Sequence, residues 1–535
     1  MKTMISSIIL ASCLALPLAS CSDSDVAPEQ KDWSTTTYFY SADAAMQDTY
    51  YKPTVGYVGD PMPFFDPVAG DFKVLYLQDF RPNPEGTYHP IWGVSTKDAA
   101  HYTSLGELVA CGTKKSQDAA IGTGSTIYDE ASKLYYTFYT GNKYLPTGDE
   151  SAQAVMVATS PDFKTWTKDR TFLLKGQDFG YDKNDFRDPF VFKGDDGKFH
   201  MLISTKKGGK GSLAEFVSDD LKNWTDNGVF MTMMWDRFYE CPDLFKMGDY
   251  WYLVYSEIHH AVRRVQYFKG RTLDELKACT ANDVARWPDA HEGFLDSRGL
   301  YAGKTASDGT NRYLWGWCPT RSGKDNTAVG ASPAEPEWGG NLVCYKLIQH
   351  EDGTLTLGQV DAVSEKYNQD VAVEVKESQN MTEADGTYTL AGNVEQPDAY
   401  MLMGRLGSHN KISFTVTTSN KWDKFGISMV RGSDSKKYYT MVVNPEDENN
   451  RKVNFEEQGV EGKGFIAGID GYVFARPADN VYNVTIYTDN SICVMYINDV
   501  CSYTNRIYGI QKNCWSINSY NAANVKISNL KISQY

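Results

Sequence analysis

Short runs of alternating or wholly apolar residues, separated by turn-forming residues, recur along the chain after its first 40 positions. One run, Phe72–Leu77, reads Phe-Lys-Val-Leu-Tyr-Leu, and another, Leu134–Tyr139, reads Leu-Tyr-Tyr-Thr-Phe-Tyr. Such runs of β-branched and aromatic residues are typical of strands and too short for most helices. The chain is 13% aromatic, with 35 Tyr and 12 Trp, which also favours strands. The pattern therefore predicts an all-β protein.

A repeat of roughly 60 residues organises the first two thirds of the chain. Each unit begins with a polar or glycine-containing start, continues through a strand and a turn, and reaches a strongly aromatic strand. A unit of this length holds four short strands, and radial repetition protects the edges of such sheets. We therefore expect residues 41–365 to form a five-bladed β-propeller; a β-sandwich with accidental periodicity is the alternative. The five unit starts are Gly59-Asp60-Pro61, Gly122-Thr123-Gly124, Arg187-Asp188-Pro189, Glu240-Cys241-Pro242 and Tyr301-Ala302-Gly303.

The repeat stops near residue 369, and a second pattern follows. Alternating strands such as Lys411–Val416 and Ser491–Ile497 are joined by turns rich in Asn, Asp and Gly. This pattern predicts a C-terminal β-sandwich over residues 370–535. The sandwich either braces the propeller or binds sugar itself.

The N-terminus carries a targeting signal. Lys2 precedes a short apolar stretch from Ile5 to Leu18, and Leu18-Ala19-Ser20 leads into Cys21. Small residues before a cysteine resemble the bacterial lipobox, so we expect residues 1–20 to be a lipoprotein signal peptide and Cys21 to be acylated. An ordinary signal peptide with an incidental cysteine is the alternative. Residues 21–40 then form a tether, and the protein is exported and held on the bacterial outer membrane, on its periplasmic or its cell-surface side, through the lipid.

Charge and cysteine usage narrow the function. The net charge of −15 argues against a nucleic-acid partner, which needs a basic face. The cysteines have no spacing typical of a metal site, so we expect neither a metal nor another cofactor. Abundant aromatic rings suit a carbohydrate substrate, because a ring can cover the apolar face of a sugar, although most of them fill β cores.

Three carboxylates stand at unit starts: Asp60, Asp188 and Glu240. The first strand of each propeller blade lines the central axis, so these side chains are predicted to converge at one end of the channel. Like charges brought close together raise the pKa of at least one carboxyl group. Glycosidic cleavage needs a protonated acid and a carboxylate on the other face of the sugar. The alternative for each Asp-Pro pair alone is a turn at a strand start.

The stretches Phe186–Phe192 and Glu240–Phe245 resemble signature motifs of glycoside hydrolase family 32, which comprises invertases, levanases and inulinases. The resemblance extends through Gly122–Ser125, Leu314–Trp317 and the sandwich, and so covers nearly all of the mature chain. It implies a retaining mechanism, with Asp60 as nucleophile, Glu240 as acid and then base, and Asp188 as transition-state stabiliser. It also implies a fructan or a sucrose-like fructoside as substrate. The substrate-facing residues that it implies are Gln78, Trp92, Ser125, Arg187 and Cys241.

The first motif departs from the family pattern. The family has asparagines on both sides of the Asp-Pro pair, where this chain has Gly59 and Met62. Thr123 likewise replaces a tryptophan that precedes Gly124-Ser125 in the family. These positions surround the sugar in the family, so another furanoside remains open. An inverting five-bladed arabinosidase or xylosidase and a non-catalytic glycan-binding lipoprotein are the alternatives. Asp296 resembles a family aspartate before the fifth blade, where a simple turn is equally expected.

Overall fold

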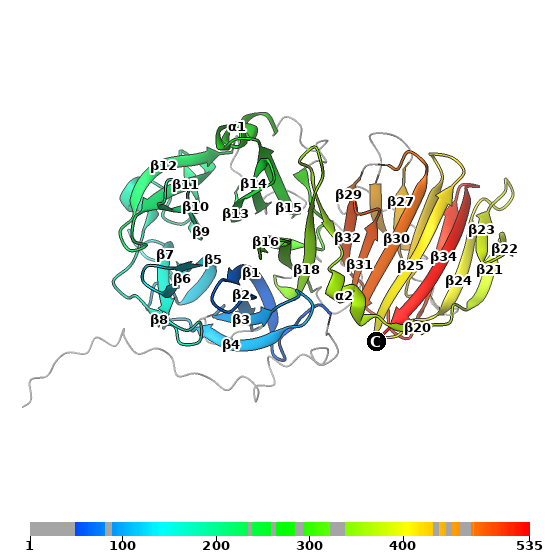
Figure 1. Ribbon diagram of the computed structural model, residues 1–535, viewed down its shortest axis with the longest axis horizontal. Coiled ribbons are helices and arrows are strands. Elements are labelled where there is room, and N and C mark those ends of the chain that lie inside the picture. The colour runs from blue at the N-terminus through cyan, green and yellow to red at the C-terminus, as the bar shows by residue number, and fades with distance from the viewer. Residues whose placement is uncertain are drawn as a thin grey trace, which may run out of the picture.

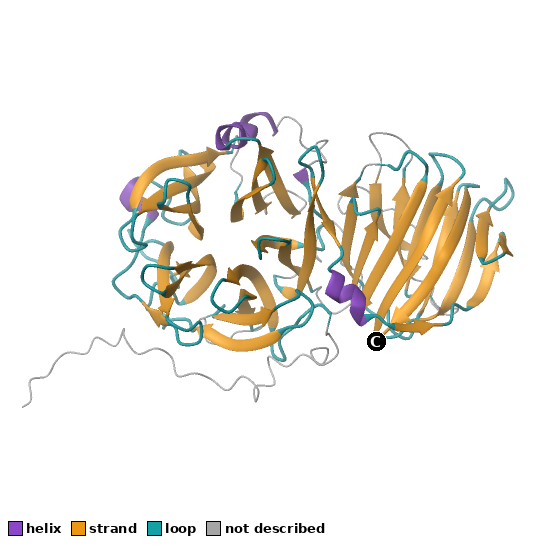
Figure 2. Cartoon of the chain, viewed as in Figure 1, coloured by secondary structure: helices purple, strands orange, loops and turns teal. Residues whose placement is uncertain are grey.

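Strands account for almost all of the regular structure, as Figure 2 shows. The computed structural model describes residues 49–80, 88–233, 238–257, 264–283, 293–320, 338–431, 438–445, 452–458, 472–474 and 476–535. The predicted signal peptide, Cys21 and the tether lie outside these residues. Within the described part, no helix has the length and apolar character needed to span a bilayer. The prediction of an all-β protein is confirmed.

Five antiparallel sheet units follow one another along the chain, each built from three or four strands. In every unit the strands pair in sequence order, so that neighbours along the chain are neighbours in the sheet. A 3-10 turn, Gly176–Phe179, precedes the third unit and helix α1, Leu273–Asp283, follows the fourth. The first unit contains β1 (Tyr57–Asp66), β2 (Asp71–Asp79), β3 (Ile91–Thr96) and β4 (Thr103–Val109). The second contains β5 (Ala120–Asp129), β6 (Leu134–Asn142), β7 (Gln153–Ser160) and β8 (Thr167–Lys168). The third contains β9 (Phe186–Lys193), β10 (Phe199–Lys207), β11 (Lys210–Ser218) and β12 (Thr225–Thr232). The fourth contains β13 (Glu240–Met247), β14 (Tyr250–Glu257) and β15 (Arg264–Gly270). The fifth contains β16 (Tyr301–Ser307), β17 (Arg312–Pro319), β18 (Gly340–Gln349) and β19 (Leu355–Gly358).

These five units form a ring, visible in Figure 1 as sheets set around a common centre. The first strands β1, β5, β9, β13 and β16 contact one another in that order, and β16 returns to contact β1. Each neighbouring pair of units shares a hydrophobic cluster, and the fifth unit packs back on the first through Trp315 and Phe72, whose ring centroids are 5.2 Å apart. Burial of apolar side chains between units therefore closes the ring, and β1 also pairs with β18 of the fifth unit at Val58 and Gly340.

The second strand of each unit is buried on both faces, which explains its sequence. β2 and β6 are almost continuously buried along their length. A strand covered on both faces has no solvent side, so it reads as a run of apolar and aromatic residues rather than as an alternation. These are the aromatic runs that mark the repeat in the sequence.

The C-terminal region consists of two sheets. β25, with alternating buried and half-buried residues, shows the period of two expected of a strand with one core face. Short helix α2, Asp361–Lys366, connects the fifth unit to this region. Residues from both sheets, among them Ile412, Phe414, Phe425, Ile427 and Trp515, form one shared core. One sheet contains β20 (Gln369–Val371), β22 (Met381–Ala384), β23 (Thr387–Ala391), β25 (His409–Thr418), β30 (Val481–Asp489), β31 (Ile492–Ile497), β32 (Cys501–Arg506) and β34 (Asn524–Gln534). The other contains β21 (Val375–Gln379), β24 (Ala399–Arg405), β26 (Lys424–Met429), β27 (Tyr438–Asn444), β28 (Lys452–Gln458), β29 (Tyr472–Val473) and β33 (Cys514–Tyr520).

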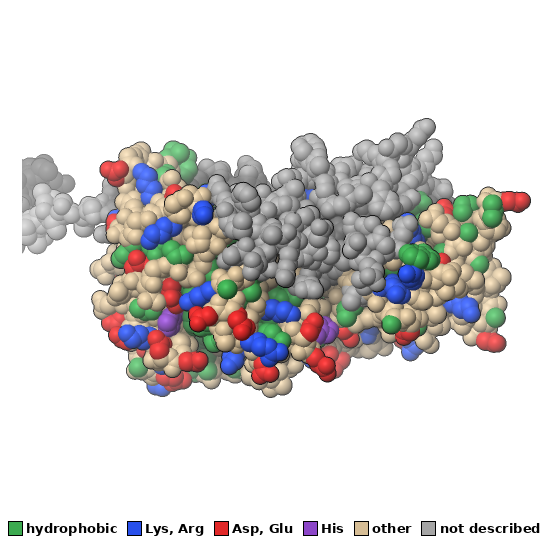
Figure 3. All heavy atoms as spheres, turned by 90° about the horizontal axis from the view of Figure 1, so that it is seen from above, with side chains coloured by type: hydrophobic (Ala, Val, Ile, Leu, Met, Phe, Trp, Pro, Cys, Tyr) green, Lys and Arg blue, Asp and Glu red, His purple; other side chains and the backbone are tan. Residues whose placement is uncertain are grey.

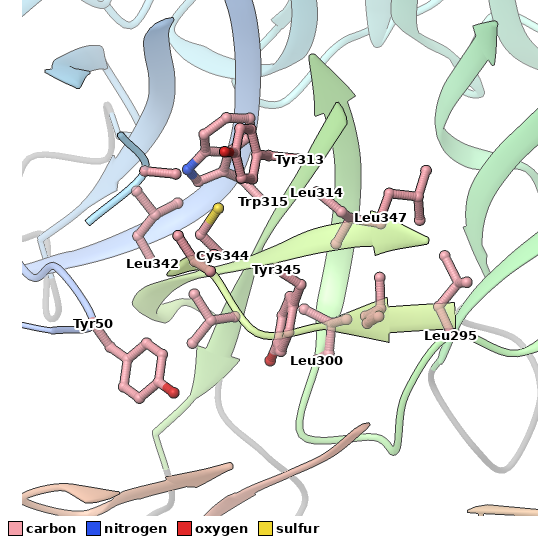
Figure 4. Close-up of a cluster of buried hydrophobic side chains, with 14 of the residues drawn as sticks. Tyr50, Leu295, Leu300, Tyr313, Leu314, Trp315, Leu342, Cys344, Tyr345 and Leu347 are labelled. Atoms are coloured by element: carbon pink, nitrogen blue, oxygen red, sulfur yellow. The ribbon is translucent and has the colours of Figure 1, made fainter. Parts of the chain in front are cut away.

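The two regions share a second hydrophobic core. Side chains of the fifth unit, including Tyr345 and Leu342 in Figure 4, lie in one cluster with Tyr487, Val494 and Tyr496 of the C-terminal sheet. The sheet that contains β30–β32 is therefore buried on both faces. The C-terminal region packs against the fifth unit as part of a continuous core.

Two buried charged residues connect the regions. Asp296 is 1% exposed and accepts hydrogen bonds from Thr504 N and Oγ1, each 2.8 Å, and from Ser502 Oγ at 2.9 Å. Arg506, 2% exposed, reaches in the opposite direction and donates to the carbonyl oxygens of Cys318 and Pro319 at the end of β17. Asp296 thus does more than form a turn: it fastens the C-terminal region to the segment before the fifth unit.

Acidic and basic side chains are interspersed over the coloured part of the face drawn in Figure 3. That face is one of mixed charge, in keeping with the absence of any overall positive charge in the sequence.

Replacing Asp296 with asparagine tests this connection. Thr504 and Ser502 would lose part of their hydrogen bonding to a buried acceptor, so we expect a loss of roughly 2–3 kcal/mol of stability. Thermal unfolding followed by circular dichroism measures it. Asp361→Asn, which removes an exposed ion pair with Lys346, is the matched control and should change stability by less than about 0.5 kcal/mol. Equal melting temperatures for wild type and Asp296→Asn would contradict the role of Asp296.

Candidate active site

A β-bulge interrupts the first strand of every unit near its start. The pairing of β1 with β2 shifts between Gly59 and Pro61, and corresponding shifts occur in β5, β9, β13 and β16. A bulge inserts one extra residue and redirects the side chains beside it. In each unit the first residue that the bulge leaves unpaired therefore stands at a corresponding place in the first strand. These five residues are Asp60, Thr123, Asp188, Cys241 and Ala302.

This register corrects the sequence alignment of the repeats. Glu240 was predicted to occupy the position of Asp60 and Asp188, but strand pairing places Cys241 there. Glu240 instead stands one residue earlier, at the position of Arg187 and Tyr301. The prediction was wrong by one residue because a bulge changes the correspondence between sequence and face. The carboxylates still meet, as their shared neighbours show below.

Three of the bulge residues have a left-handed backbone. φ is +57° at Asp188, +51° at Cys241 and +53° at Ala302. This region is costly for residues other than glycine, and it persists only where the surrounding structure enforces it. Here both flanking strand segments are held in the sheet, so the strained residue turns its side chain or its N–H group toward the axis.

Asp60 is held by two donors from other units. Thr123 Oγ1 donates to its Oδ2 at 2.6 Å, and Trp317 Nε1 donates to its Oδ1 at 2.9 Å. Each carboxylate oxygen thus has one directed partner. Donors of this kind fix the orientation of the carboxylate.

Glu240 is held in the same way by a cation and a phenol. Arg187 Nη2 donates to Oε1 at 2.9 Å, and the Tyr301 hydroxyl donates to Oε2. Tyr301 also packs edge-on against Trp317, with ring centroids 5.5 Å apart. The aromatic partner of Glu240 therefore contacts the aromatic partner of Asp60, which joins the two carboxylates in one cluster.

Asp188 is the most buried of the three carboxylates, at 4% exposure. Its Oδ2 accepts a hydrogen bond of 2.9 Å from the backbone N–H of Cys241. Burial raises its pKa to about 7, Arg187 opposes the rise, and the negative charges of Glu240 and Asp60 add to it. The sequence predicted that crowding would raise the pKa of one carboxyl group; the pKa of Asp188 is raised, but burial contributes more to the rise than the neighbouring carboxylates do.

Arg187 is the cation of the cluster. Burial lowers its pKa, but Glu240 and Asp188 raise it by more, so the guanidinium stays charged. Its Nη1 donates to Asp185 at 2.7 Å, and its plane lies over the Phe238 ring at 3.8 Å. Arg187 is therefore oriented on every side, as a positioned partner of Glu240 must be.

Cys241 is a neutral thiol. It is 2% exposed, and burial, followed by the charges of Asp60 and Asp188, raises its pKa well above the ordinary value. Its Sγ lies 3.9 Å from Thr123 Oγ1. Because only the thiolate is nucleophilic, Cys241 fills space beside the carboxylates and offers its N–H to Asp188.

Three other residues were predicted to contact the substrate: Gln78, Ser125 and Trp92. Gln78 is fully buried at the end of β2, where its Nε2 donates to Val55 O at 2.6 Å, and its Oε1 has no hydrogen-bond partner among the described residues. Ser125 bridges β5 and β9 by donating to Pro189 O and accepting from Val191 N. Trp92 stands on β3, away from the axis, with its ring against Phe80.

Several site residues were not predicted from the sequence. Tyr301 and Trp317 bind the two carboxylates directly, whereas the sequence indicated only that Tyr301 stands at a unit start and that Trp317 lies in a stretch resembling the family. Trp338 packs on Gly59, where a Cβ atom would lie 2.1 Å from the indole ring, and stacks on His89 with centroids 4.1 Å apart. Glycine is thus the only residue type that leaves room for the Trp338 indole at position 59. The missing family asparagine at position 59 was the one available signal.

Two family profiles match the sequence of this chain. The profile of the N-terminal domain of glycosyl hydrolases family 32 matches residues 50–360, which is more than half of the chain. The chain belongs to glycoside hydrolase family 32. A second profile of the same family, the BT1760-like C-terminal domain, matches residues 353–532.

Curated relatives of this family 32 protein are distant. It is 26% identical over 310 residues to the Arabidopsis thaliana beta-fructofuranosidase, insoluble isoenzyme CWINV2, a match that covers 52% of this chain and 50% of that enzyme. It is 27% identical over 219 residues to the Escherichia coli sucrose-6-phosphate hydrolase, covering 39% of this chain and 43% of that one. The chain therefore spans about half the length of the curated relatives that it matches.

Solved structures share the fold over nearly the whole chain. A GH32 beta-fructofuranosidase from Bombyx mori superposes with a TM-score of 0.65 at 16% identity, covering 92% of this chain and 95% of that one. An exo-inulinase from Aspergillus awamori superposes with a TM-score of 0.66 at 15% identity, covering 91% and 98%. At this identity the likeness establishes the fold.

The raised pKa of Asp188 predicts how stability depends on pH. In the unfolded chain an aspartate titrates near about 3.9, so between that value and about 7 the native state holds a proton that the unfolded state has lost. Stability should therefore fall as the pH rises through this window, by at most about 1.4 kcal/mol per pH unit. Asp188→Asn removes this contribution, so its melting temperature relative to wild type should rise from pH 4 to pH 7. Asp219→Asn, at an exposed aspartate, is the control that should run parallel to wild type, and a parallel Asp188→Asn curve would contradict the assignment.

Proposed function

We propose that this protein is a retaining glycoside hydrolase that cleaves fructofuranosidic bonds in fructans or sucrose-like fructosides. The observation that carries the proposal is the meeting of Asp60, Asp188 and Glu240 at one end of the ring in a family 32 chain. Their partners differ: two neutral donors for Asp60, a cation and a phenol for Glu240, and a buried backbone N–H for Asp188. Three carboxyl groups in three environments can take three roles.

Asp60 is suited to be the nucleophile. Thr123 and Trp317 each bind one of its oxygens, so the carboxylate is fixed in direction without a salt bridge that would quench its charge. In the first step one Asp60 oxygen forms a bond to the anomeric carbon of the fructosyl unit while the bond to the leaving oxygen breaks. The product is a covalent fructosyl-enzyme, which water then hydrolyses.

Glu240 is suited to be the acid and then the base. It donates a proton to the leaving oxygen in the first step and takes one from water in the second. Arg187 and Tyr301 hold its two oxygens, and the phenol oxygen of Tyr301 can accept a hydrogen bond when Glu240 carries the proton. The carboxyl group therefore keeps its position through both steps.

Asp188 is suited to bind sugar hydroxyls. With a pKa of about 7, it can accept or donate a hydrogen bond near neutral pH. Hydrogen bonds to sugar hydroxyls that strengthen in the transition state contribute several kcal/mol in such enzymes. Gln78, with an unoccupied buried oxygen, and Arg187 complete the substrate-facing group in this proposal; Trp92, Ser125 and Cys241 support it from behind.

The architecture of the proposal is a five-bladed β-propeller, residues 41–365, followed by a β-sandwich, residues 370–535. The five sheet units serve as the blades; hydrophobic packing between them closes the ring, together with the antiparallel pairing of β1 with β18 at Val58 and Gly340. The C-terminal region braces the fifth blade through Asp296 and Arg506. Bracing is the role that these contacts support.

Substitution of the proposed nucleophile and acid tests these roles. Asp60→Asn should lower kcat on levan, inulin or sucrose by about a thousandfold or more, because an amide cannot form the covalent intermediate. Glu240→Gln should lower kcat by about 100-fold to 10,000-fold on these poor leaving groups and by less on an activated aryl fructoside. Released sugars are measured by chromatography, with circular dichroism to show that each variant is folded. Full activity of either variant would refute the role assigned to that residue, and a wild type inactive on all three sugars would refute the proposed function.

Membrane attachment through Cys21 is a further part of the proposal. Its support is the sequence Leu18-Ala19-Ser20-Cys21 after a short apolar stretch, which together form a lipobox-like signal. A multi-chain lipid on Cys21 would hold the enzyme on the outer membrane and place it near extracellular or periplasmic carbohydrate.

Cys21→Ala should convert the protein from a membrane-bound to a released form. Without the acylated cysteine, residues 22–40 offer no hydrophobic segment that could hold the protein on a bilayer. Immunoblots of membrane and soluble fractions, with a substitution at Ser22 as control, measure the distribution. Continued sedimentation of Cys21→Ala with the membrane would disprove the lipid anchor.

A further inference from the structure

Lys304 crosses the centre of the ring. It lies on β16 of the fifth unit, two residues after the bulge at Ala302, and is 2% exposed. Its Nζ donates at 2.7 Å to the carbonyl oxygen of Gly124 on β5 of the second unit. The first unit separates the second unit from the fifth, so this side chain spans the axis between units that are not neighbours.

The contact point lies directly behind the proposed nucleophile. Gly124 follows Thr123, whose hydroxyl donates to Asp60, and its own position is fixed because a Cβ atom there would lie 1.8 Å from Phe138 O. The ammonium group also lies 5.3 Å from the centroid of the Phe190 ring on β9. Lys304 is therefore enclosed by the first strands of the second and third units as well as its own.

The charged and titratable groups near the axis come from four strands, β1, β9, β13 and β17. β1 contributes Asp60, β9 contributes Asp188 and Arg187, β13 contributes Glu240, Cys241 and Asp243, and β17 contributes Arg312. Burial lowers the pKa of Lys304, and the neighbouring Cys241, Asp243, Asp188 and Asp60 oppose that change. Arg187 donates hydrogen bonds to Asp185 and Glu240. Arg312 donates to the hydroxyl of Thr305, and that hydroxyl donates to Asp243. Lys304 thus shares the charge of Asp188 with Arg187 and that of Asp243 with Arg312, and it also interacts with Asp60.

A hydrogen bond to Gly124 does not by itself require a charge. A neutral amide could make the same contact, whereas burying an ammonium group costs several kcal/mol unless opposite charges offset the cost. The neighbouring carboxyl groups supply that offset, and by the same attraction the ammonium group favours the ionised forms of Asp188 and Asp243, whose pKa values burial raises.

We propose that Lys304 is a positioning residue of the active site, whose ammonium group closes the axis behind Asp60, through the backbone of Gly124, and favours the ionised form of Asp188. The inference rests on the proposed function for its kinetic consequence, and on the geometry alone for its effect on the carboxylates. Lys304 does not touch the substrate in this scheme. It acts through Asp60 and Asp188.

Two substitutions separate the charge from the contact. Lys304→Gln keeps a donor for Gly124 but removes the charge, and Lys304→Met removes both. Lys366→Gln is the matched control, because Lys366 Nζ also donates at 2.7 Å to a backbone carbonyl, that of Ala100, far from the axis. The readouts are kcat/KM against pH on the sugar that wild type cleaves, and melting temperature against pH.

Loss of the charge should move the acid limb of the kcat/KM profile to higher pH by about one unit in both Lys304 variants. On the acid side of the limb this is about a tenfold loss of activity, while the plateau changes much less. Lys366→Gln should keep the wild-type profile. If Lys304→Gln also superimposed on wild type and only Lys304→Met lost stability, the residue would be a neutral clamp and the proposal would be overturned.

The melting curves decide the question without any activity. Without the ammonium group the buried carboxyl groups bind protons more tightly in the native state, so stability should fall more steeply with rising pH in Lys304→Gln than in wild type or Lys366→Gln. Parallel curves would overturn the proposal. An inactive wild type with diverging curves would refute the proposed function and leave the role of Lys304 supported.

Discussion

Like charges brought together in a nearly dry interior repel one another, and each also loses the solvation that water would give it. The axis of this protein holds Asp60, Asp188 and Glu240 under this constraint, and the surrounding residues are the means of tolerating it. Arg187 binds Glu240 and also attracts Asp188, while the buried ammonium group of Lys304 binds the backbone of Gly124 and attracts the carboxylates from there. The loss of solvation and the repulsion that these cations do not offset raise the pKa of Asp188. The charge state of the site is therefore set by the whole ring rather than by any one strand.

The polar groups of the site must also point toward the axis, and the bulges in the first strands make this possible. A regular strand would point its side chains along the sheet faces, into the packing between units. The bulge in each first strand adds a residue at which the chain can turn a carboxylate, a hydroxyl or an N–H group toward the axis, at the cost of left-handed backbone at Asp188, Cys241 and Ala302. Hydrophobic clusters between all neighbouring units, and the buried Asp296 and Arg506 at the boundary with the C-terminal region, hold that strain in place. The contacts that stabilise the ring therefore also fix the positions of the site residues.

The sequence revealed what is periodic and local. The second strands, buried on both faces, appear in the sequence as aromatic runs, and these runs reveal the repeat. The carboxylates could be recognised because each stands at the start of a repeat unit. The one-residue offset of Glu240 was hidden, because a bulge is a feature of pairing between strands and leaves no fixed mark in one of them.

Tyr301, Trp317, Trp338 and Lys304 were hidden for a different reason. Each acts on a residue in another unit: Trp317 on Asp60 is a contact across 257 positions, and Lys304 on Gly124 one across 180. Such partners become neighbours only when the ring closes. The replacement of the family asparagine by Gly59 was visible, but its meaning, room for the Trp338 indole, required the fold.

Trapping the covalent intermediate tests the central claim most directly. The Glu240→Gln variant is mixed with an activated aryl fructoside, whose leaving group needs no acid, and is quenched and analysed by intact-mass and peptide mass spectrometry. Since the variant lacks the base for the second step, a fructosyl-enzyme should accumulate. The account predicts one added hexosyl unit, located on the peptide that contains Asp60 and absent from an Asp60→Asn, Glu240→Gln double variant. Turnover of the aryl fructoside without any adduct, and with inversion at the anomeric carbon of the released fructose, would contradict it.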